Sequence, residues 1–152
     1  MSKELKAQDL RIGNLVNVEI GRDILPVCVS GISSGSIAFD VLPNEKEWKS
    51  GRREIIVTKP IPLTEDWLVK FGFEKRGIDK FSIKINPEQI HSSQIFTIDK
   101  QTYIALGDNK FEYWVVNGIP LYHLEHIHQL QNLYYALTQT ELTLKENVQP
   151  AT

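Results

Sequence analysis

The sequence predicts an α+β protein built mostly from antiparallel β-strands, with one short helix in the middle of the chain and a longer helix near its C-terminus. Both halves contain short apolar stretches separated by glycine, proline, serine and asparagine, which is typical of strands joined by turns. A capped amphipathic segment follows Pro62, and apolar residues recur at helical spacing after residue 122. We therefore expect a small curled sheet or barrel, then a second meander, with the two helices packed on strands.

Length and composition indicate a globular chain with a proper core. The chain has 152 residues, of which 41% are hydrophobic and 24% charged, as in ordinary folded proteins. We expect residues 1–145 to form a single α+β domain with two sub-parts. Residues 8–62 form the barrel-like sub-part, residues 63–145 the helix-meander-helix sub-part, and residues 146–152 a polar tail.

Charge and cysteine content limit the classes of function. The net charge is -2, so any binding to nucleic acid or to an anionic membrane must depend on a local patch. The single Cys28 excludes an intramolecular disulfide, fits a reducing compartment and is expected to be a buried, inert thiol. The opening "MSKELKAQDL" has no apolar run of a signal peptide, and no stretch is long and apolar enough for a bilayer. We expect a cytoplasmic protein without membrane contact.

Four strands are expected in the first half, in the stretches "IGNLVNVEI", "ILPVCVSGI", "SGSIAFDVL" and "REIIV". The serine- and glycine-rich segment from Ser30 to Ser36 lacks the lysine of a phosphate-binding loop and precedes a strand, so it predicts a hairpin turn. Pro60 and Pro62 are expected to end the strand pattern, because proline supplies no N–H to a ladder.

The segment "LTEDWLVKFGF" predicts a short helix. Thr64 can cap its start, Glu65 and Asp66 suit the positive end of the helix dipole, and Gly72 can end it. One face carries the apolar side chains Trp67, Leu68 and Phe71.

Four more alternating stretches predict the second meander: "DKFSIKI", "SQIFTID", "TYIALG" and "KFEYWVV". Asp108 and Asn109 suit the hairpin turn before the last of them. The tripeptide Ile-Pro-Leu occurs before both expected helices. It could mark a duplication, but we favour coincidence or convergent helix capping, because proline is common at the start of a helix.

The stretch "YHLEHIHQLQNLYYALT" predicts the longer helix. Its apolar side gathers Leu124, Ile127, Leu130, Leu133, Tyr134 and Leu137, and His126 falls within that side. His128 points nearly opposite, beside Asn132 and Tyr135. The three histidines of this stretch therefore do not all face one ion.

No metal or other cofactor is expected. His123 and His126 are three residues apart and could chelate together, but zinc needs further ligands, and His91 and Cys28 are distant in sequence. The interpretation favoured is that the histidines border a core. The helix face with His128, Asn132 and Tyr135 is the candidate partner surface, and a simply solvated face is the alternative.

The candidate ligand site is the charged segment "NEKEWKSGRRE". It places Trp48 near Lys49, Arg52 and Arg53, so that an indole could stack on a base and guanidinium groups could hold a phosphate. Three glutamates dilute this charge. The alternative is a solvated loop whose tryptophan folds back on the core.

The sequence favours a protein that is not an enzyme and names no catalytic residue. It contains no Gly-x-Ser-x-Gly elbow and no recognisable set of serine, histidine and aspartate. A hydrolase with a site assembled across the fold stays open as a third hypothesis.

The segments "DLRIGNLV", "PIPLTEDWLVKFGFEK" and "HIHQLQNLYYALTQTEL" resemble a group of small proteins from Bacteroidetes genomes and their phages, for which no activity is established. The resemblance covers the start and both helices and transfers no catalytic residue. It implies a phage or prophage accessory protein, a setting in which small oligomeric β-rich proteins often bind host factors or sequester nucleotide signals of host defence.

The first hypothesis is thus a non-enzymatic, homo-oligomeric binding protein that captures a small anionic, nucleotide-like ligand or a host protein, to counter host defence. The alternative is a nucleic-acid-associated module on the small barrel, with Lys49, Arg52 and Arg53 on phosphates.

Overall fold

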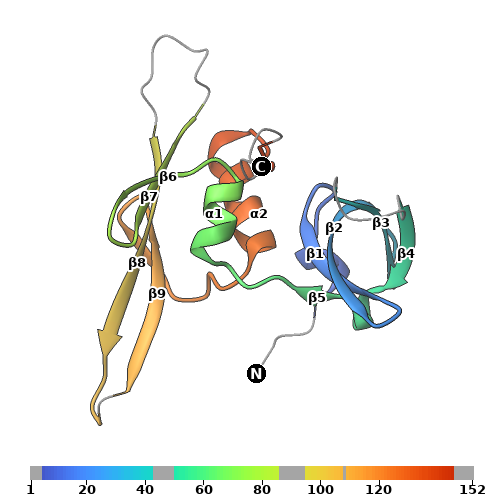
Figure 1. Ribbon diagram of the computed structural model, residues 1–152, viewed down its shortest axis with the longest axis horizontal. Helices are drawn as coiled ribbons and strands as arrows, with labels where there is room; N and C mark the ends of the chain where they lie inside the picture. Colours follow the sequence, from blue (N-terminus) through green and yellow to red (C-terminus); the bar gives the residue numbers. More distant parts are fainter. Residues whose placement is uncertain (1–4, 43–49, 86–94, 108, 146–152) are drawn as a thin grey trace. The chain divides into compact units, whose positions relative to one another are not determined.

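The structure is a computed structural model that describes residues 5–42, 50–85, 95–107 and 109–145. Two five-stranded antiparallel sheets and two α-helices make up the described chain (Figure 1). The predicted fold class, mostly antiparallel β with a short middle helix and a longer C-terminal helix, is confirmed. Neither sheet is closed.

The chain divides into two compact units. The first unit combines Met1–Pro62 with His126–Ala136, and the second combines Leu63–Glu125 with Leu137–Thr152. The larger part of the C-terminal helix thus belongs to the same unit as the first sheet.

The first sheet has the strand order β4-β3-β2-β1-β5. Its strands are β1 (Leu15–Ile20), β2 (Asp23–Ile32), β3 (Ser36–Val41), β4 (Ser50–Glu54) and β5 (Lys59–Pro60), with 3-10 turns η1 (Ala7–Asp9) and η2 (Ile55–Val57). The alternating inward residues form its core, which includes Val16, Val18, Val27, Val29, Ile37 and Phe39. Ser33 N donates to Ser36 O (2.9 Å), which closes the predicted turn between β2 and β3.

Three details of this sheet differ from the sequence prediction. The stretch "REIIV" is not one strand, because β4 ends at Glu54 opposite Ser36, the first residue of β3, and Ile55–Val57 turn away as η2. Pro60 does pair, in the two-residue strand β5, which lies at the sheet edge where a missing N–H costs no ladder bond. Cys28 is half-buried rather than fully buried.

The second sheet is a simple meander, β10-β9-β8-β7-β6. Its strands are β6 (Glu74–Gly77), β7 (Lys80–Lys84), β8 (Ile95–Ile104), β9 (Lys110–Val116) and β10 (Ile119–Leu121). The expected strands "SQIFTID" and "TYIALG" overlap one continuous strand, β8, since Lys100 and Gln101 pair without a break with β9; residues 93–94 lie outside the described residues. Strands β6 and β10 were not predicted, because charge in the first and a proline in the second mask the strand pattern.

Helix α1 (Glu65–Lys70) begins and ends as predicted. Thr64 Oγ1 accepts from Trp67 N (3.4 Å), and Gly72 follows the helix with φ of 96°. Leu68 and Phe71 are buried. The Phe73 ring, just after the helix, lies 6.0 Å from the Phe96 ring of β8, so this segment covers one face of the second sheet.

Helix α2 (Ile127–Thr138) begins five residues later than the predicted stretch. His123 therefore lies outside the helix and is exposed. Ile127, the first helical residue, donates its N–H to Ile61 O (2.9 Å), and Pro62 forms a β-bridge with His126. This extended pairing of residues 126 and 127 holds the chain out of helical geometry before Ile127.

Candidate functional site

The structure describes two of the four residues of the predicted anionic-ligand site, Arg52 and Arg53. Trp48 and Lys49 lie outside the described residues. Arg52 and Arg53 are neighbours on β4, so their side chains point to opposite faces of the strand. Arg53 lies opposite the fully buried Ile37, and Arg52 lies opposite Ala38 and is exposed. The two guanidinium groups therefore do not form one fork for a phosphate.

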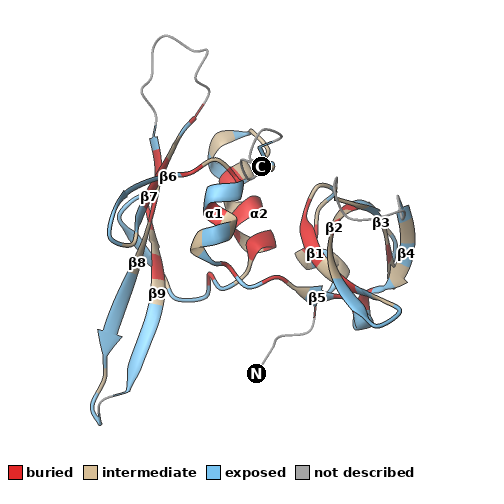
Figure 2. Cartoon of the chain, viewed as in Figure 1, coloured by how far each residue is buried: buried red, intermediate tan, exposed pale blue. Residues whose placement is uncertain are grey.

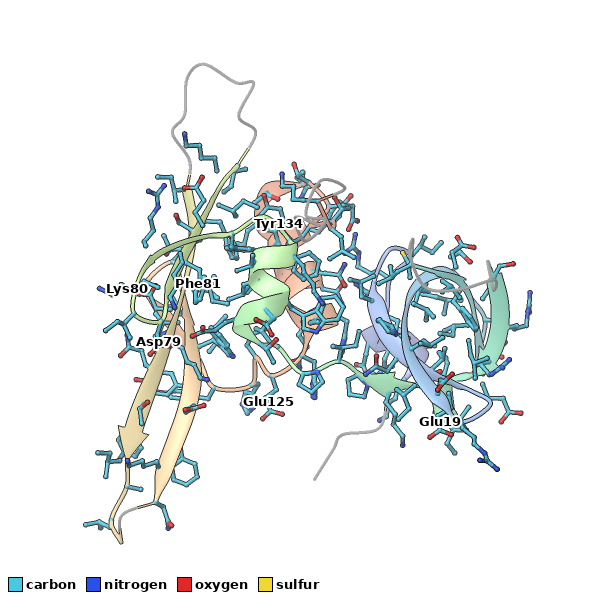
Figure 3. All side chains as sticks on the ribbon, in the orientation of Figure 1. Glu19, Asp79, Lys80, Phe81, Glu125 and Tyr134 are labelled. Atoms are coloured by element: carbon cyan, nitrogen blue, oxygen red, sulfur yellow. The ribbon has the colours of Figure 1, made fainter. Side chains whose placement is uncertain are left out.

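Arg53 also has hydrogen bonds within the first unit. Its Nε donates to Glu19 O of β1 (3.3 Å), and its Nη1 donates to Arg52 O (2.8 Å); Figure 3 labels Glu19. Strands β1 and β4 are not neighbours in the sheet, so the bond to Glu19 connects two strands that the sheet ladder does not join directly. Arg53 acts as a structural residue of the barrel-like sheet.

The predicted partner surface on the C-terminal helix is not a solvated face. His128 is 5% exposed, and the Asn132 and Tyr135 side chains are half-buried against the start of the chain in the first unit. The Arg11 guanidinium carbon lies 4.1 Å from the centre of the Tyr135 ring. The expectation of an outward face is wrong, because the polar side of α2 has hydrogen-bonding partners that helical periodicity does not reveal.

Those partners belong to the segment that precedes β1. Asn14 Nδ2 and Arg11 Nη1 both donate to Asn132 Oδ1 (2.8 and 3.1 Å), and Asn132 Nδ2 donates to Asp9 O (3.1 Å). These bonds satisfy an amide that would otherwise be desolvated on packing.

Gln131 makes the deepest contact of this kind. Gln131 is 1% exposed. Its Oε1 accepts a hydrogen bond from Leu15 N (2.8 Å), and its Nε2 donates one to Gly13 O (3.0 Å). The amide side chain thus bonds to the backbone in the way that a neighbouring strand would. The segments "DLRIGNLV" and "HQLQN", which carry part of the resemblance, thus contact each other. Their polar residues hold the helix on the first sheet, which is a structural role.

The histidines of the C-terminal stretch do not assemble a metal centre. His126 and His128 stack with ring centroids 5.8 Å apart and planes at 16°. Across the part of the chain that the structure describes, no three histidine, cysteine, aspartate or glutamate side chains group in a way that could hold a metal ion.

Burial raises the pKa of the helix residue Tyr134 above its ordinary value.

The feature that the sequence did not predict is a projecting hairpin in the second unit. Strand β8 pairs with β7 only up to Asp99, and β9 pairs with β10 only from Trp114. Between these limits β8 and β9 pair only with each other among the described strands, and Figure 1 shows them extending beyond the sheet as a two-stranded ribbon. We call the described residues within 101–113 the arm; Asp108 lies outside the described residues.

Almost all described residues of the arm are exposed, as the pale blue ribbon in Figure 2 shows. Leu106 at the tip is 99% exposed and Ile104 63%. A two-stranded ribbon that buries no apolar surface gains little stability from its own contacts. Exposed apolar residues concentrated on such a ribbon indicate a surface that another molecule covers.

One face of the arm is aromatic. Tyr103 and Phe111 lie directly opposite each other on β8 and β9 and are 58% and 56% exposed. Tyr113 follows two residues after Phe111, and its ring lies 4.9 Å from that of Tyr122, which is 64% exposed. We call these four residues the aromatic face. They alternate with the buried Ile98 and Trp114, so they lie on the side of the sheet opposite the core.

Charges near the aromatic face offset one another. Lys80 and Asp99, which share its side of the sheet, lie opposite each other across β7 and β8. On the other side of the arm, Lys100 Nζ and Glu112 Oε2 form an ion pair at 3.0 Å. The surface is therefore aromatic and close to neutral, which suits an apolar protein surface better than a phosphate backbone.

Comparison with protein-family models, curated proteins and solved structures found no match to the chain. Neither helix in the described ranges has the length and apolar character that crossing a membrane requires. The candidate site therefore depends on the geometry of the arm. The sequence shows that Tyr103, Phe111 and Tyr113 occupy alternate positions of expected strands. It does not show that the β8–β9 hairpin extends past the ends of β7 and β10.

Proposed function

We propose that this protein is a non-enzymatic binding protein that holds a protein partner on the aromatic face of its arm. The observation that carries the proposal is the exposed cross-strand pair Tyr103 and Phe111, on a ribbon beside which no third strand lies among the described residues. Tyrosine and phenylalanine are enriched in protein interfaces, where each gives a large contact area at a small entropic cost.

A protein partner fits the aromatic face better than a nucleic acid does. Bases also stack on aromatic side chains, but such sites add a groove of cations along the phosphates. The described charges on this side of the sheet are mixed in sign rather than uniformly basic. Lys80 lies opposite Asp99 across β7 and β8, and Glu74, which lies opposite Ser82, forms an ion pair with Arg76 at 2.9 Å. The resemblance to Bacteroidetes phage proteins makes a bacterial host protein the expected partner, and interference with host defence the expected role.

A small anionic ligand receives less support than it did from the sequence. Its two described candidates, Arg52 and Arg53, point to opposite faces of β4, and Arg53 bonds to the Glu19 carbonyl. No arrangement of the described residues favours a nucleotide over a protein partner.

Site-specific photo-crosslinking in Bacteroidetes cells tests the proposal. Benzoylphenylalanine replaces Phe111 in one variant and Ile56 in a control; Ile56 is an equally apolar residue of the first unit that is 66% exposed. We expect a discrete adduct with a host protein from position 111 and none from position 56. Adding Tyr103→Ser to the first variant should remove the adduct.

Three results would count against the proposal. They are equal labelling from both positions, an adduct that survives Tyr103→Ser, and an adduct with nucleic acid instead of protein. An adduct at twice the chain mass of 17.4 kDa reports contact between two copies and does not bear on the host partner.

A further inference from the structure

The outer edge of β9 along the arm has the features of a strand-pairing site. Strand β10 covers β9 only from Trp114 to Val116, and no other described strand lies beside residues 110–112. An uncovered edge presents backbone N–H and C=O groups that readily pair with another strand.

The direction of these backbone groups follows from the hydrogen bonds of the hairpin. Ala105 N donates to Asn109 O (2.8 Å), and Asn117 N donates to Thr97 O (3.0 Å). The backbone N–H and C=O groups of odd-numbered residues in β8 and β9 therefore point toward the other strand of the hairpin. Even-numbered residues face outward, as Lys100 does when its N–H donates to Asp79 O (2.8 Å); Figure 3 labels Asp79. In β9 the outward groups of the arm are therefore those of Lys110 and Glu112.

We propose that this edge pairs with the same edge of a second copy of the chain, antiparallel and centred on Phe111. A two-fold axis perpendicular to the sheet then places Phe111 beside its symmetry mate as a non-hydrogen-bonded pair, in which side chains approach closely. Lys110 of each copy lies opposite Glu112 of the other, and their outward backbone groups form the ladder bonds. The register is complementary in charge because the two residues that must pair have opposite signs.

Other registers and the other edge are less complementary. Centring the pair on Glu112 would bring two glutamates together, and centring it on Lys110 would bring two lysines together. The outer edge of β8 is partly occupied, because the Lys100 N–H already bonds to Asp79, and the remaining outward residues Thr102 and Ile104 carry no charge to match.

Pairing centred on Phe111 forms a four-stranded ribbon from two arms. The aromatic faces of the two copies then lie on the same side of this ribbon, because a two-fold axis perpendicular to the sheet relates each face to the face on the same side. The ladder bonds of the dimer use the backbone edge, although Phe111 of the aromatic face lies at the centre of the pair. The substitutions that test the pairing change no aromatic residue, so loss of the dimer can be told apart from loss of host-protein binding.

Sedimentation velocity of the purified full chain over a micromolar to millimolar series tests the pairing. We expect a concentration-dependent monomer–dimer equilibrium. Lys110→Glu alone and Glu112→Lys alone each place like charges opposite each other and should weaken dimerisation at least tenfold. The double exchange Lys110→Glu with Glu112→Lys restores opposite charges between the copies. It still loses the ion pair of Glu112 with Lys100 within each hairpin, so dimerisation should recover well above either single variant but below the natural chain.

Proline substitution separates the edge from the fold. Lys110→Pro removes an outward N–H and leaves the bonds between β8 and β9 in place, so it should abolish the dimer while circular dichroism stays unchanged. Thr102→Pro, the equivalent change on β8, should leave the dimer intact. A monomer at the highest concentration, failure of the double exchange to recover dimerisation, or loss of the dimer only with Thr102→Pro would overturn the inference.

Discussion

Replacement of Gln131 by methionine tests whether the polar side of α2 holds the helix on the first sheet. Methionine is unbranched and similar in length, so it fills the same space without a large cavity. The change removes two hydrogen bonds of the amide, one from Leu15 N at 2.8 Å and one to Gly13 O at 3.0 Å. Each backbone group then loses its partner in a place that water reaches poorly.

The expected cost follows from the burial of the two groups. Leu15 is 4% exposed, so its N–H stays desolvated and unpaired, at about 1–3 kcal/mol. Gly13 is half-buried, so water can partly replace the lost donor, and its carbonyl adds about 1 kcal/mol. We therefore expect Gln131→Met to lower the free energy of unfolding of the first unit by about 2–4 kcal/mol.

Urea unfolding, followed by nuclear magnetic resonance signals of the first unit, measures this change. For an unfolding slope of about 2 kcal/mol per M urea, the midpoint should fall by roughly 1–2 M. The Leu15 amide should also exchange with solvent markedly faster than in the natural chain. Gln101→Met, at an exposed glutamine of β8, is the matched control and should change stability by less than about 0.5 kcal/mol. Equal midpoints for the Gln131 variant and the control would refute a stabilising role for the amide.

Three further changes probe other parts of the structure. Gly51→Ala should destabilise the first unit by about 1–3 kcal/mol in urea unfolding, because the added Cβ would lie 2.7 Å from Phe39 Cζ, whereas Gly35→Ala, with nothing within 4 Å, should not; equal effects would contradict this packing. Burial raises the pKa of Tyr134 above its ordinary value of about 10, so stability should be constant below that pH and fall above it. Tyr134→Phe should reduce the alkaline loss, and an unchanged pH profile would contradict its attribution to Tyr134. Nucleotides and cyclic dinucleotides should leave the melting temperature unchanged, while a rise that disappears in the Arg52→Ala, Arg53→Ala double variant would favour the anionic-ligand hypothesis.

The sequence was sufficient to predict those helices and strands that depend on interactions between residues close together in the chain. Thr64 and Gly72 mark the ends of α1 through a cap and a positive φ, and both act over a few residues. Alternating apolar residues likewise located most strands. Strand β10 was missed because Pro120 stands in it, and a sheet edge tolerates proline in a way that the sequence alone does not show.

The site depended on contacts that are distant along the chain. Helical spacing placed His128 and Asn132 opposite the apolar side of α2, and it could not show that Asp9, Arg11 and Asn14 bond there from more than a hundred residues away. The arm was missed for a related reason. Its exposure depends on where β7 and β10 stop, and strand length is set by pairing rather than by the residues of β8 and β9 themselves.

The most direct test of the account is the affinity of the host protein captured at Phe111 for purified variants of the chain. Isothermal titration should show at least a tenfold loss of affinity in the Tyr103→Ser, Phe111→Ser double variant, because two exposed aromatic contacts at an interface centre are removed. The Arg52→Ala, Arg53→Ala double variant should bind as the natural chain does. The opposite pattern, with affinity kept by the aromatic variant and lost by the arginine variant, would contradict the assignment of binding to the arm.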